Sequence, residues 1–438
     1  MLALAFNNDT SRSLTLYGLA LLGSGIRNVD INSVDPGNPT VSSLMTPARW
    51  YFLSVTSFVI PMGIQTVLFP WLLAIELQLG ARELGLGQMA LQIPALFLIL
   101  IGGFLADRLD ARKMLITLHL IAILPPLTLA LFISQGALSF TLMIMYALSM
   151  GVVTAFSQPA RDKLLSAIAG NQIQRTVTIV MGLTFGAQIV GFAIASLTES
   201  TGAELLFVVM AIILLSGMLA AFKLPASPGN PDRSSSMGES IAEGLYIVLE
   251  SEKMRATAIM LATLSLFYGG TFLVLNPLIV RDVYQGGATE IALSFACFMS
   301  GTVITSVALV ARGGLKNPGL GLLLAVSIGG VMLALAATGL PFVGYLAVLI
   351  AWGSCGGVAM SMGRTIVQEL APESHRARVL SVLSLANVGV LPFGALLMGF
   401  CADYLGILNS FLVATAGAWL MTAYVATRTR LAHLELDT

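Results

Sequence analysis

The stretch from Met114 to Ala160 reads MLITLHLIAILPPLTLALFISQGALSFTLMIMYALSMGVVTAFSQPA and contains no Asp, Glu, Lys or Arg. A second uncharged stretch of the same length, 47 residues, reads NPGLGLLLAVSIGGVMLALAATGLPFVGYLAVLIAWGSCGGVAMSMG from Asn317 to Gly363. It begins 203 positions after the first, and the same offset relates the arginines that follow the two stretches. Each stretch is long enough for two helices of about 20 residues, the length that crosses a hydrocarbon core of roughly 30 Å. A repeat of this size predicts a membrane protein of two homologous halves, an organisation typical of transporters.

The composition excludes a soluble domain. Of the 438 residues, 57% are hydrophobic and only 10% are charged, whereas about a quarter of a soluble domain is charged. The mean hydropathy is +0.90. The formal net charge is zero, so the charge balance gives no indication of nucleic acid or another polyanion as a partner. Cys297, Cys355 and Cys401 lie singly in apolar stretches, and we interpret them as small apolar side chains without a disulfide or metal role.

Eight other charge-free stretches accompany the two long ones. They are Trp50–Ile75, Leu84–Ala106, Thr176–Thr198, Leu205–Phe222, Ala256–Val280, Ile291–Ala311, Val379–Ala402 and Tyr404–Thr427. The long stretches are each expected to divide in two, near Gly136 and near Leu340–Pro341. Each span should be helical, because backbone amides cannot remain unpaired in lipid. The predicted fold is therefore an all-α integral membrane protein with twelve transmembrane helices in two pseudo-symmetric six-helix bundles.

The distribution of basic residues predicts the orientation. On a path of twelve helices, 20 of the 22 Lys and Arg residues fall on one side, and only Arg82 and Arg281 fall on the other. The positive-inside rule places the basic side in the cytoplasm. We therefore expect a multi-pass protein of the bacterial inner membrane with both termini in the cytoplasm.

The expected organisation has five parts. Residues 1–46 form a cytoplasmic tail, 47–222 the first six-helix bundle, 223–255 a cytoplasmic linker, 256–427 the second bundle and 428–438 a second cytoplasmic tail.

The first tail has no stretch long enough to span. Leu14–Ile26 is apolar but too short, and it lacks the basic start and the cleavage site of a signal peptide. Asp30–Thr46 is rich in Asn, Ser, Pro and Gly and is expected to be a loop. A short surface helix within the tail and a true start of the protein at Met45 both remain open.

The linker begins with a Pro- and Ser-rich segment and ends with a helical pattern. In that pattern Ile241, Leu245, Val248 and Leu249 share one helical face, opposite four glutamates. This predicts a short amphipathic helix. It either lies on the membrane surface or forms a solvated linker helix.

The connection between the second and third spans carries a specific motif, Gly103-Phe-Leu-Ala-Asp107-Arg108-Leu-Asp110-Ala-Arg112-Lys113. Here the sequence resembles the major facilitator superfamily, whose loop signature is G-x-L-a-D-R-x-G-r-[RK]. The resemblance extends over roughly residues 48–430. The positions that match are Gly103, Asp107, Arg108, Arg112 and Lys113, whereas Asp110 stands where the family usually has Gly. The resemblance implies a conformational latch, in which Asp107 faces the start of the eleventh helix behind Arg376 and Arg378. The offset brings Val310, Ala311 and Leu315 to the equivalent positions of the second half, so the latch is expected to be asymmetric.

Two further loops, beginning at Arg161 and at Arg364, are related by the 203-residue offset. They resemble the enterobactin-exporter and macrolide-efflux branch of the superfamily. We expect them to act as gating loops, through Arg161, Arg175, Arg364 and Glu369. The alternative is that these arginines only anchor helix ends at the lipid headgroups.

Small residues predict where helices pack closely. They are Gly182, Gly186 and Gly191 in the fifth helix, and Gly389 and Gly394 in the eleventh. Exporters of this superfamily often carry G-x-x-x-G-P-x-x-G-G in the fifth helix. Here Ala187 replaces the proline, so the antiport signature is only partial and favours export without fixing the direction.

No acidic residue lies in the middle of a span, so the sequence offers no carboxylate as a proton site or as a counter-ion for a cationic drug. The substrate cavity is therefore expected to be lined by uncharged polar side chains: Gln65, Gln92, Gln188, Tyr268, Asn276 and Asn387. For each of them the alternative is a hydrogen bond between helices. His119, in the third helix, is expected to be structural.

These observations predict a secondary active transporter that works by alternating access. We expect it to export an amphipathic small molecule, such as a siderophore, a drug or a lysolipid, by proton antiport. It should act as a monomer in a lipid bilayer, with no cofactor, no metal and no catalytic residues. The alternatives are a small-molecule importer working by uniport or symport and a non-transporting membrane sensor. The sequence shows no metal-ligand set, nucleophile elbow or phosphate loop of an enzyme.

Overall fold

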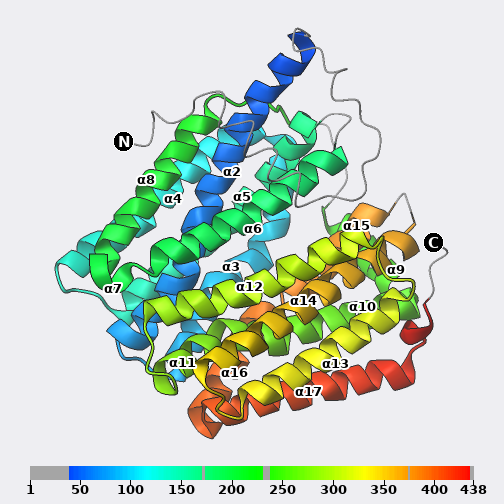
Figure 1. Ribbon diagram of the computed structural model, residues 1–438. Helices are drawn as coiled ribbons and strands as arrows, with labels where there is room; N and C mark the ends of the chain where they lie inside the picture. Colours follow the sequence, from blue (N-terminus) through cyan, green and yellow to red (C-terminus); the bar gives the residue numbers. More distant parts are fainter. Residues whose placement is uncertain (1–38, 170–172, 230–236, 373–374, 435–438) are drawn as a thin grey trace, which may run out of the picture. The chain divides into compact units, whose positions relative to one another are not determined.

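The structure is a computed structural model that describes residues 39–169, 173–229, 237–372 and 375–434 (Figure 1). The chain forms two units, residues 1–46 and 47–438, and the description below concerns the second. The apolar stretch Leu14–Ile26 lies outside the described residues. The loop expected up to Thr46 is corrected at its end, because the first helix begins at Pro39. Proline is tolerated in a first helical turn, where its missing amide hydrogen is not needed.

The first half of the membrane part, residues 47–222, is entirely helical between short connections. Its elements are α2 (Pro39–Trp71), the π-helical turn η2 (Leu72–Glu76), α3 (Ala81–Arg108), α4 (Ala111–Ser134), α5 (Phe140–Ala169), α6 (Ile173–Ala195), α7 (Thr198–Thr201) and α8 (Ala203–Ala221).

The linker contributes α9 (Met237–Glu250), and the second half, residues 252–434, follows it directly. Its elements are α10 (Glu252–Thr263), η4 (Leu264–Gly269), η5 (Thr271–Leu275), α11 (Asn276–Asp282), α12 (Ala288–Ala311), α13 (Pro318–Ala336), α14 (Phe342–Leu370), α15 (Arg376–Val388), α16 (Leu391–Leu405), α17 (Ile407–Arg428) and η6 (Leu431–His433). The seventh expected span therefore contains two π-helical turns, and the eleventh is interrupted between α15 and α16.

Both long uncharged stretches divide where the sequence predicts. α4 ends at Ser134, and Gly136 has a φ of +66°. α13 ends at Ala336, and Gly339 has a φ of +70°. These left-handed backbone angles favour glycine, which has no Cβ to clash with the neighbouring carbonyl oxygen.

The described residues contain ten helices that are long and apolar enough to cross a membrane. The count is eleven if the bent pair Ala81–Ile99 and Ile101–Arg108, both parts of α3, is one span. α6 has a shorter apolar stretch, Ile179–Ala195. The all-α membrane fold is thus confirmed, whereas the number twelve is not.

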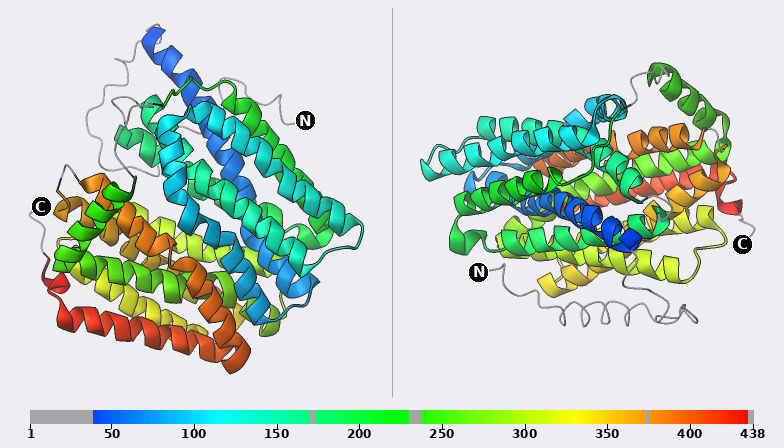
Figure 2. Two further views of the ribbon diagram at one scale, coloured as in Figure 1. Left: turned by 180° about the vertical axis from the view of Figure 1, so that it is seen from behind. Right: turned by 90° about the horizontal axis from the view of Figure 1, so that it is seen from above.

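The helices of the two halves repeat the same packing. In the first half α3 packs on α5, and α4 packs on both α5 and α8. In the second half α12 packs on α14, and α13 packs on both α14 and α17. Two contacts between the halves are also related, α3 with α16 and α12 with α6. Figures 1 and 2 show these neighbours running side by side. The 203-residue repeat in the sequence is therefore a repeat in space.

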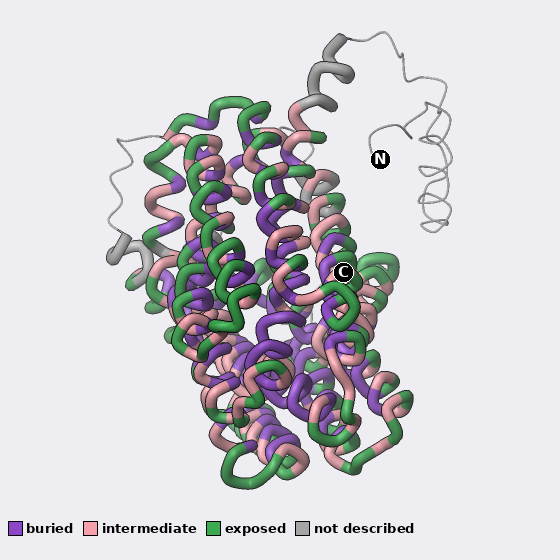
Figure 3. Tube along the Cα trace, turned by 90° about the vertical axis from the view of Figure 1, so that its left-hand side faces the viewer, coloured by how far each residue is buried: buried purple, intermediate pink, exposed green. Residues whose placement is uncertain are grey.

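Burial agrees with a bundle that meets lipid. Buried residues line the inward faces of the helices, and exposed residues cover their outer faces (Figure 3). Many exposed side chains are large and apolar, for example Leu124 at 62% and Leu420 at 71% relative exposure. Water would not favour such a surface, whereas the hydrocarbon core of a bilayer would cover it.

Glycines let backbones touch in equivalent places of the two halves. A Cβ added at Gly191 of α6 would lie 2.4 Å from the carbonyl oxygen of Ile60 on α2. A Cβ added at Gly394 of α16 would lie 2.4 Å from that of Leu266 in η4. Gly182 and Gly186 have no atom within 4 Å of the added Cβ. In this conformation these two glycines make no helix contact, and packing there remains a prediction for another state.

Candidate functional site

The loops that connect the helices lie on two sides of the bundle. The linker side carries the connection between α3 and α4 and the linker itself, and the far side carries loops 77–80 and 283–287. The predicted latch lies on the linker side. The hydrogen bonds that join the two halves lie on the far side.

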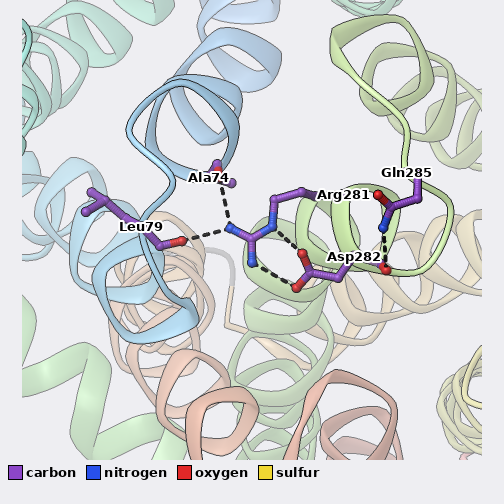
Figure 4. Close-up of polar contacts among 5 residues, drawn as sticks. All are labelled: Ala74, Leu79, Arg281, Asp282 and Gln285. Atoms are coloured by element: carbon purple, nitrogen blue, oxygen red, sulfur yellow. Dashed lines mark hydrogen bonds and ion pairs between the residues drawn. The ribbon is translucent and has the colours of Figure 1, made fainter.

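Arg281, in the last turn of α11, connects the halves on the far side (Figure 4). Its Nη1 donates to the carbonyl oxygens of Ala74 and Leu79, at 2.9 and 2.8 Å. Its Nε and Nη2 bind both carboxylate oxygens of Asp282. This bidentate pairing fixes the plane of the guanidinium and leaves Nη1 directed at the first half. Arg281 is thus a bridge between α11 and the end of the first span.

Two hairpins of the same kind surround this bridge. η2 is followed by Gln78 with a φ of +50°, and α11 is followed by Gln285 with a φ of +52°. Few residues other than glycine adopt this left-handed backbone conformation without cost. Gln285 also donates from Nε2 to the carbonyl oxygen of Asp282, at 2.9 Å. The strained turns therefore shape the two hairpins that Arg281 joins.

A second link is formed by Glu199 in α7. Its Oε1 accepts a hydrogen bond of 3.0 Å from the backbone amide of Ala288, the first residue of α12. Thr289 donates to the carbonyl oxygen of Ser196 at 3.0 Å. A carboxylate at a helix N-terminus is favoured by unpaired amides and by the helix dipole. Gly287 has no side chain to obstruct Glu199, because an added Cβ would lie 1.5 Å from its Oε1.

A cavity of about 590 Å³ lies at this second link. It is lined by Ile75, Glu199, Tyr284, Gln285, Gly286, Gly287, Glu290 and Phe342. The Tyr284 hydroxyl donates to the carbonyl oxygen of Leu340 at 2.9 Å. Burial raises the pKa of the Tyr284 phenol, which keeps it in the neutral form that donates this bond.

Apolar contacts close the interface behind these polar links. The rings of Phe192 on α6 and Phe295 on α12 lie 5.9 Å apart. An added Cβ at Gly85 of α3 would lie 2.9 Å from the carbonyl oxygen of Ala395, and one at Gly399 would lie 2.8 Å from that of Ala81. The halves are therefore in close contact from the far side inward.

On the linker side, Asp110 is the central residue of the motif loop. Its Oδ1 accepts from the backbone amide of Arg112 at 3.0 Å and caps α4. The same oxygen accepts from the amide of Ser227 in the linker at 3.2 Å. Lys163 of α5 donates to the carbonyl oxygens of Ala106 and Leu109, at 2.7 and 3.1 Å, and so closes the end of α3. Asp110, the departure from the family motif, thus ties the loop to the linker.

The other predicted latch residues in this loop have separate positions. Asp107 is exposed at the end of α3, and Arg108 lies over the ring of Phe104, 4.2 Å from its centroid. Arg112 donates to the carbonyl oxygen of Phe222 at 2.6 Å, just after α8. Lys113 is exposed, and Gly103 has nothing within 4 Å of an added Cβ.

The predicted latch residues in the second half contact the linker helix. Arg378 and His375 both bind Glu243 of α9, the latter at 2.5 Å. The Nε of Arg376 is buried and has no hydrogen-bond partner among the residues that the structure describes. The backbone of Arg378 also lies against Gly244, 2.9 Å from an added Cβ. The start of α15 is therefore attached to α9.

The predicted gating residues do not form one cluster. Arg161 lies within α5, where its Nη2 donates to Gln158 Oε1 at 2.8 Å. Its backbone oxygen accepts from the Tyr51 hydroxyl at 3.1 Å. Arg364 and Glu369 are exposed near the end of α14, and Arg175 lies in the first turn of α6.

Four of the predicted cavity residues make hydrogen bonds between helices. Tyr146 donates to Gln65 Oε1 at 2.8 Å, and Tyr268 donates to the carbonyl oxygen of Val326 at 2.5 Å. Asn276 bonds to Ser294 and to Tyr345, and Asn387 accepts from Ser265. This arrangement matches the alternative that the sequence left open for these residues.

Gln92 and Gln188 differ from these four. Both are half-buried, and neither amide makes a hydrogen bond with another described residue. An unpaired amide within a span can bind a polar group of a ligand without breaking an existing bond.

A cluster of aromatic rings in the second half was not foreseen from the sequence. It consists of Tyr268, Phe272, Phe295, Phe298 and Trp352, with ring centroids 4.2 to 6.2 Å apart. The residues belong to η4, η5, α12 and α14, and Phe295 touches Phe192 of the first half. The only signal in the sequence is that these helices carry aromatic residues, because their meeting depends on how the helices pack. We call this set the aromatic cluster. Among the described residues, no group of His, Cys, Asp and Glu is arranged to bind a metal ion.

The fold and the motif loop allow comparison with known proteins. The model of the Major Facilitator Superfamily matches residues 51–389. The chain belongs to the Major Facilitator Superfamily. The resemblance inferred from the motif loop is therefore confirmed, and the efflux branch is also represented among the relatives.

Three curated relatives are similar at low identity. The staphyloferrin A transporter of Staphylococcus aureus is 23% identical over 76% of this chain and 84% of its own. Macrolide efflux protein A of Streptococcus pyogenes is 24% identical over 71% of this chain and 78% of its own. The multidrug efflux pump Tap of Mycolicibacterium fortuitum is 24% identical over 85% of this chain and 93% of its own.

Solved structures agree on the fold. The nucleoside transporter NupG has a TM-score of 0.69 at 14% identity, covering 87% of this chain and 98% of NupG. A POT family transporter in complex with 5-aminolevulinic acid has a TM-score of 0.68 at 12% identity, covering 89% of this chain and 96% of its own. At such low identities these structures show only that this chain shares their fold, and they give no information on its cargo.

Proposed function

We propose that this superfamily member is a secondary active transporter that exports an amphipathic small molecule by alternating access and proton antiport. The cargo class is that of a siderophore, a drug or a lysolipid. The relatives that transport staphyloferrin A, expel macrolides or expel several drugs support export and this class of cargo. The protein works as a monomer of two six-helix halves, without a resident cofactor.

The observation that carries the proposal is the position of the contacts between the halves. Arg281 and Glu199 hold the halves together on the far side, and Phe192 and Phe295 close the interface behind them. A transporter with alternating access must break these links when it opens to that side. No other described side chain donates to the two backbone oxygens that Arg281 binds, so the release of Arg281 breaks this link in one step. The far side is therefore a gate in its closed state.

The linker side is assigned to the cytoplasm. It carries most of the Lys and Arg residues, which supports this orientation by the positive-inside rule. A gate closed on the far side then corresponds to a protein that loads cargo from the cytoplasm. In the opposite state Asp107 would meet the start of α15 and close the linker side.

The cargo surface is assigned to Gln92, Gln188 and the half-buried members of the aromatic cluster, Phe272 and Phe298. The two amides provide hydrogen bonds, and the rings provide apolar area with a specific geometry. A molecule with one polar and one apolar part satisfies both. Neither charge nor metal chemistry is required of it.

Transport assays in proteoliposomes test the proposal. Purified protein is reconstituted, a pH gradient is imposed in either direction, and the movement of a panel containing a macrolide, a siderophore and a lysolipid is measured. We expect one class to move against its gradient when protons flow the opposite way. Arg281→Ala serves as the impaired variant and Asp403→Ala, an exposed residue on the same side, as the matched control.

The alternative functions have distinct outcomes. Movement of the panel with the proton gradient identifies an importer, and movement independent of the gradient excludes proton coupling. If no compound moves under any gradient while the protein is folded, transport of these classes is refuted and the sensor alternative stands.

A further inference from the structure

His119 and Ser57 form a buried polar pair inside the first half. His119 lies in α4 and Ser57 in α2, and their side chains are 0% and 2% exposed. The imidazole Nε2 lies 3.0 Å from the Ser57 hydroxyl oxygen, and Nδ1 lies 2.9 Å from the carbonyl oxygen of Leu115. The Ser57 hydroxyl is also 2.8 Å from the carbonyl oxygen of Ser54. The pair is thus bounded at both ends by oxygens that can only accept.

The positions of the hydrogens in this chain follow from its ends. A carbonyl oxygen cannot donate, so Nδ1 carries a hydrogen and donates it to Leu115. In neutral His119, Nε2 has only a lone pair, and the Ser57 hydroxyl must turn its single hydrogen to it. If Nε2 instead gains a proton, it donates to Ser57, and the Ser57 hydrogen turns to the carbonyl oxygen of Ser54. Both protonation states are therefore satisfied by turning one hydroxyl hydrogen, without moving a heavy atom.

A histidine whose Nε2 faces a hydroxyl that has a second acceptor can be hydrogen-bonded in both protonation states. The ring has no room to escape, because a Cβ added at Gly217 of α8 would lie 1.8 Å from Ser57 Oγ and 2.4 Å from His119 Nε2. Phe58 covers another face, with its ring centroid 4.0 Å from that of His119. We propose that the His119–Ser57 pair is the site in the first half that binds and releases the coupling proton, with the Ser54 carbonyl oxygen as the second acceptor.

The chemistry of the step is simple. The ring is closed off from solvent in this state. When a rearrangement of the first half admits water, a hydronium ion gives its proton to the lone pair of Nε2. The imidazole becomes an imidazolium with one positive charge, and no other covalent bond forms or breaks. Release returns the proton to water.

Arg161 of α5 is the charge that opposes this step. Its guanidinium lies over the ring of Phe58, 5.5 Å from the centroid, and its charge acts on His119. The Nε of Arg161 is buried without a hydrogen-bond partner among the described residues. Burial of the ring opposes a charged imidazole most, and the positive charge of Arg161 opposes it further, so His119 gains a proton when Arg161 moves away and water reaches the ring. A rearrangement of α5 would thus be coupled to protonation.

The other ionisable groups on the helices around His119 lie farther along them. Glu204 of α8 is 13 residues from Gly217, roughly 20 Å along the helix axis. α3, which contacts α4 only slightly, carries its charges at its two ends. Besides Arg161, the ionisable residues on these helices are Arg49 and Tyr51 on α2, Arg82, Glu83, Asp107 and Arg108 on α3, Arg112 and Lys113 on α4, Tyr146, Asp162 and Lys163 on α5, and Glu204 on α8. No carboxylate among them faces the imidazole, so burial of the ring and, after it, the charge of Arg161 oppose the uptake of a proton.

The inference rests on the proposed proton antiport for its role, but the site itself can be tested without cargo. The sequence has three histidines. In a variant with His375→Gln and His433→Gln, the single remaining histidine is His119. The full-length protein is labelled with nitrogen-15 histidine in lipid nanodiscs, and its ring nitrogen signals are followed by NMR from acid to neutral pH.

We expect His119 to titrate, and Arg161→Gln to move the midpoint upward by about one pH unit. We expect Ser57→Ala to move the midpoint downward. The protonated imidazole would lose the Ser57 oxygen as the acceptor for Nε2, and a hydrogen bond from a charged donor is stronger than the one that neutral His119 loses. Ser149→Ala, an exposed serine bonded to its own helix, is the matched control and should leave the midpoint unchanged.

The opposite results overturn the proposal. If His119 stays neutral throughout, also in Arg161→Gln, it binds no proton and is structural. If Ser57→Ala raises the midpoint, Ser57 serves the neutral ring as a donor and the proposed exchange is wrong. If His119 titrates as expected while cargo movement ignores the proton gradient, the site stands and the proposed antiport fails.

Discussion

Arg281 donates a hydrogen bond of 2.8 Å to the carbonyl oxygen of Leu79, and this bond joins the end of α11 to the loop between η2 and α3. The donor and the acceptor belong to different halves of the repeat. Since Asp282 binds the other side of the guanidinium, the arginine is held in place before it reaches the first half. Because the guanidinium has a fixed orientation, its hydrogen bonds to the two backbone oxygens form or break together.

Asp107→Asn is expected to increase the population of the state described here. The substitution removes the charge that would face the N-terminus of α15 when the linker side closes, an effect of about 1 kcal/mol or about fivefold in population. Spin labels on Ser166→Cys and Gln368→Cys, both exposed on the linker side, report the distance across that side in a protein with the native cysteines replaced by Ser. Asp403→Asn, the same change on the far side, is the control. Equal distance distributions in the Asp107→Asn variant and the unmutated protein would refute the latch.

Asp110→Ala is expected to destabilise the protein. It removes the cap of α4 and the bond to Ser227, at a cost of about 1–2 kcal/mol. The apparent Tm of the purified protein should therefore fall by a few degrees. Asp110→Asn keeps an accepting oxygen and should lose much less. An unchanged Tm for Asp110→Ala would show that the loop does not depend on this carboxylate.

Gly191→Ala and Gly394→Ala should each destabilise the fold by about 1–3 kcal/mol, because the added methyl group meets backbone oxygens that cannot move away. Gly186→Ala is the matched control in the same helix as Gly191, since nothing lies within 4 Å of its added Cβ. Fluorescence-detected size-exclusion chromatography after a series of heat steps measures the difference. Similar losses for Gly186→Ala and Gly191→Ala would contradict the described packing of α6 on α2.

Exchanging the charges of Glu243 and Arg378 should first weaken and then restore the attachment of α9. The pair is partly exposed, at 42% and 35% of the two side chains, so screening by water limits its effect to well below that of a buried pair. Hydrogen exchange of residues 242–250 should be faster by about twofold to fivefold in Glu243→Arg. The double variant with Arg378→Glu should recover the original rate. Failure of the double variant to recover would mean that packing at Gly244 and Val248, rather than charge, holds the helix.

The sequence predicts the repeat, the spans and their breaks because these depend on local properties. Apolar length identifies the spans, and glycines such as Gly136 mark the turns by their backbone requirement. The motif at Asp107 and Arg108 also suffices to identify the superfamily, since its spacing is specific. These features need no knowledge of which helix lies beside which.

The gate could not be predicted, because its contacts depend on which helices lie side by side. Arg281 binds the backbone oxygens of Ala74 and Leu79, and an oxygen of the main chain has no signature in the sequence. The only hint is that Arg281 is one of two basic residues expected on its side. Asp110 likewise deviates from the family pattern, but its bond to Ser227 depends on where the linker lies. Gln65 and Asn276 show the same limit, since a polar residue in a span bonds to a neighbour or a ligand according to the packing.

If the far side is a gate held closed by Arg281, removal of this side chain should open it. Spin labels on Ser200→Cys in the first half and Thr338→Cys in the second, both exposed on the far side, allow its opening to be measured by double electron–electron resonance in nanodiscs. The native cysteines are replaced by Ser, and Arg281→Ala is compared with Asp403→Ala, at an exposed residue of the same side. We expect a longer distance across the far side in Arg281→Ala, with the distance between labels at Ser166 and Gln368 becoming shorter in the same variant. A distance across the far side that is unchanged by Arg281→Ala would contradict this expectation.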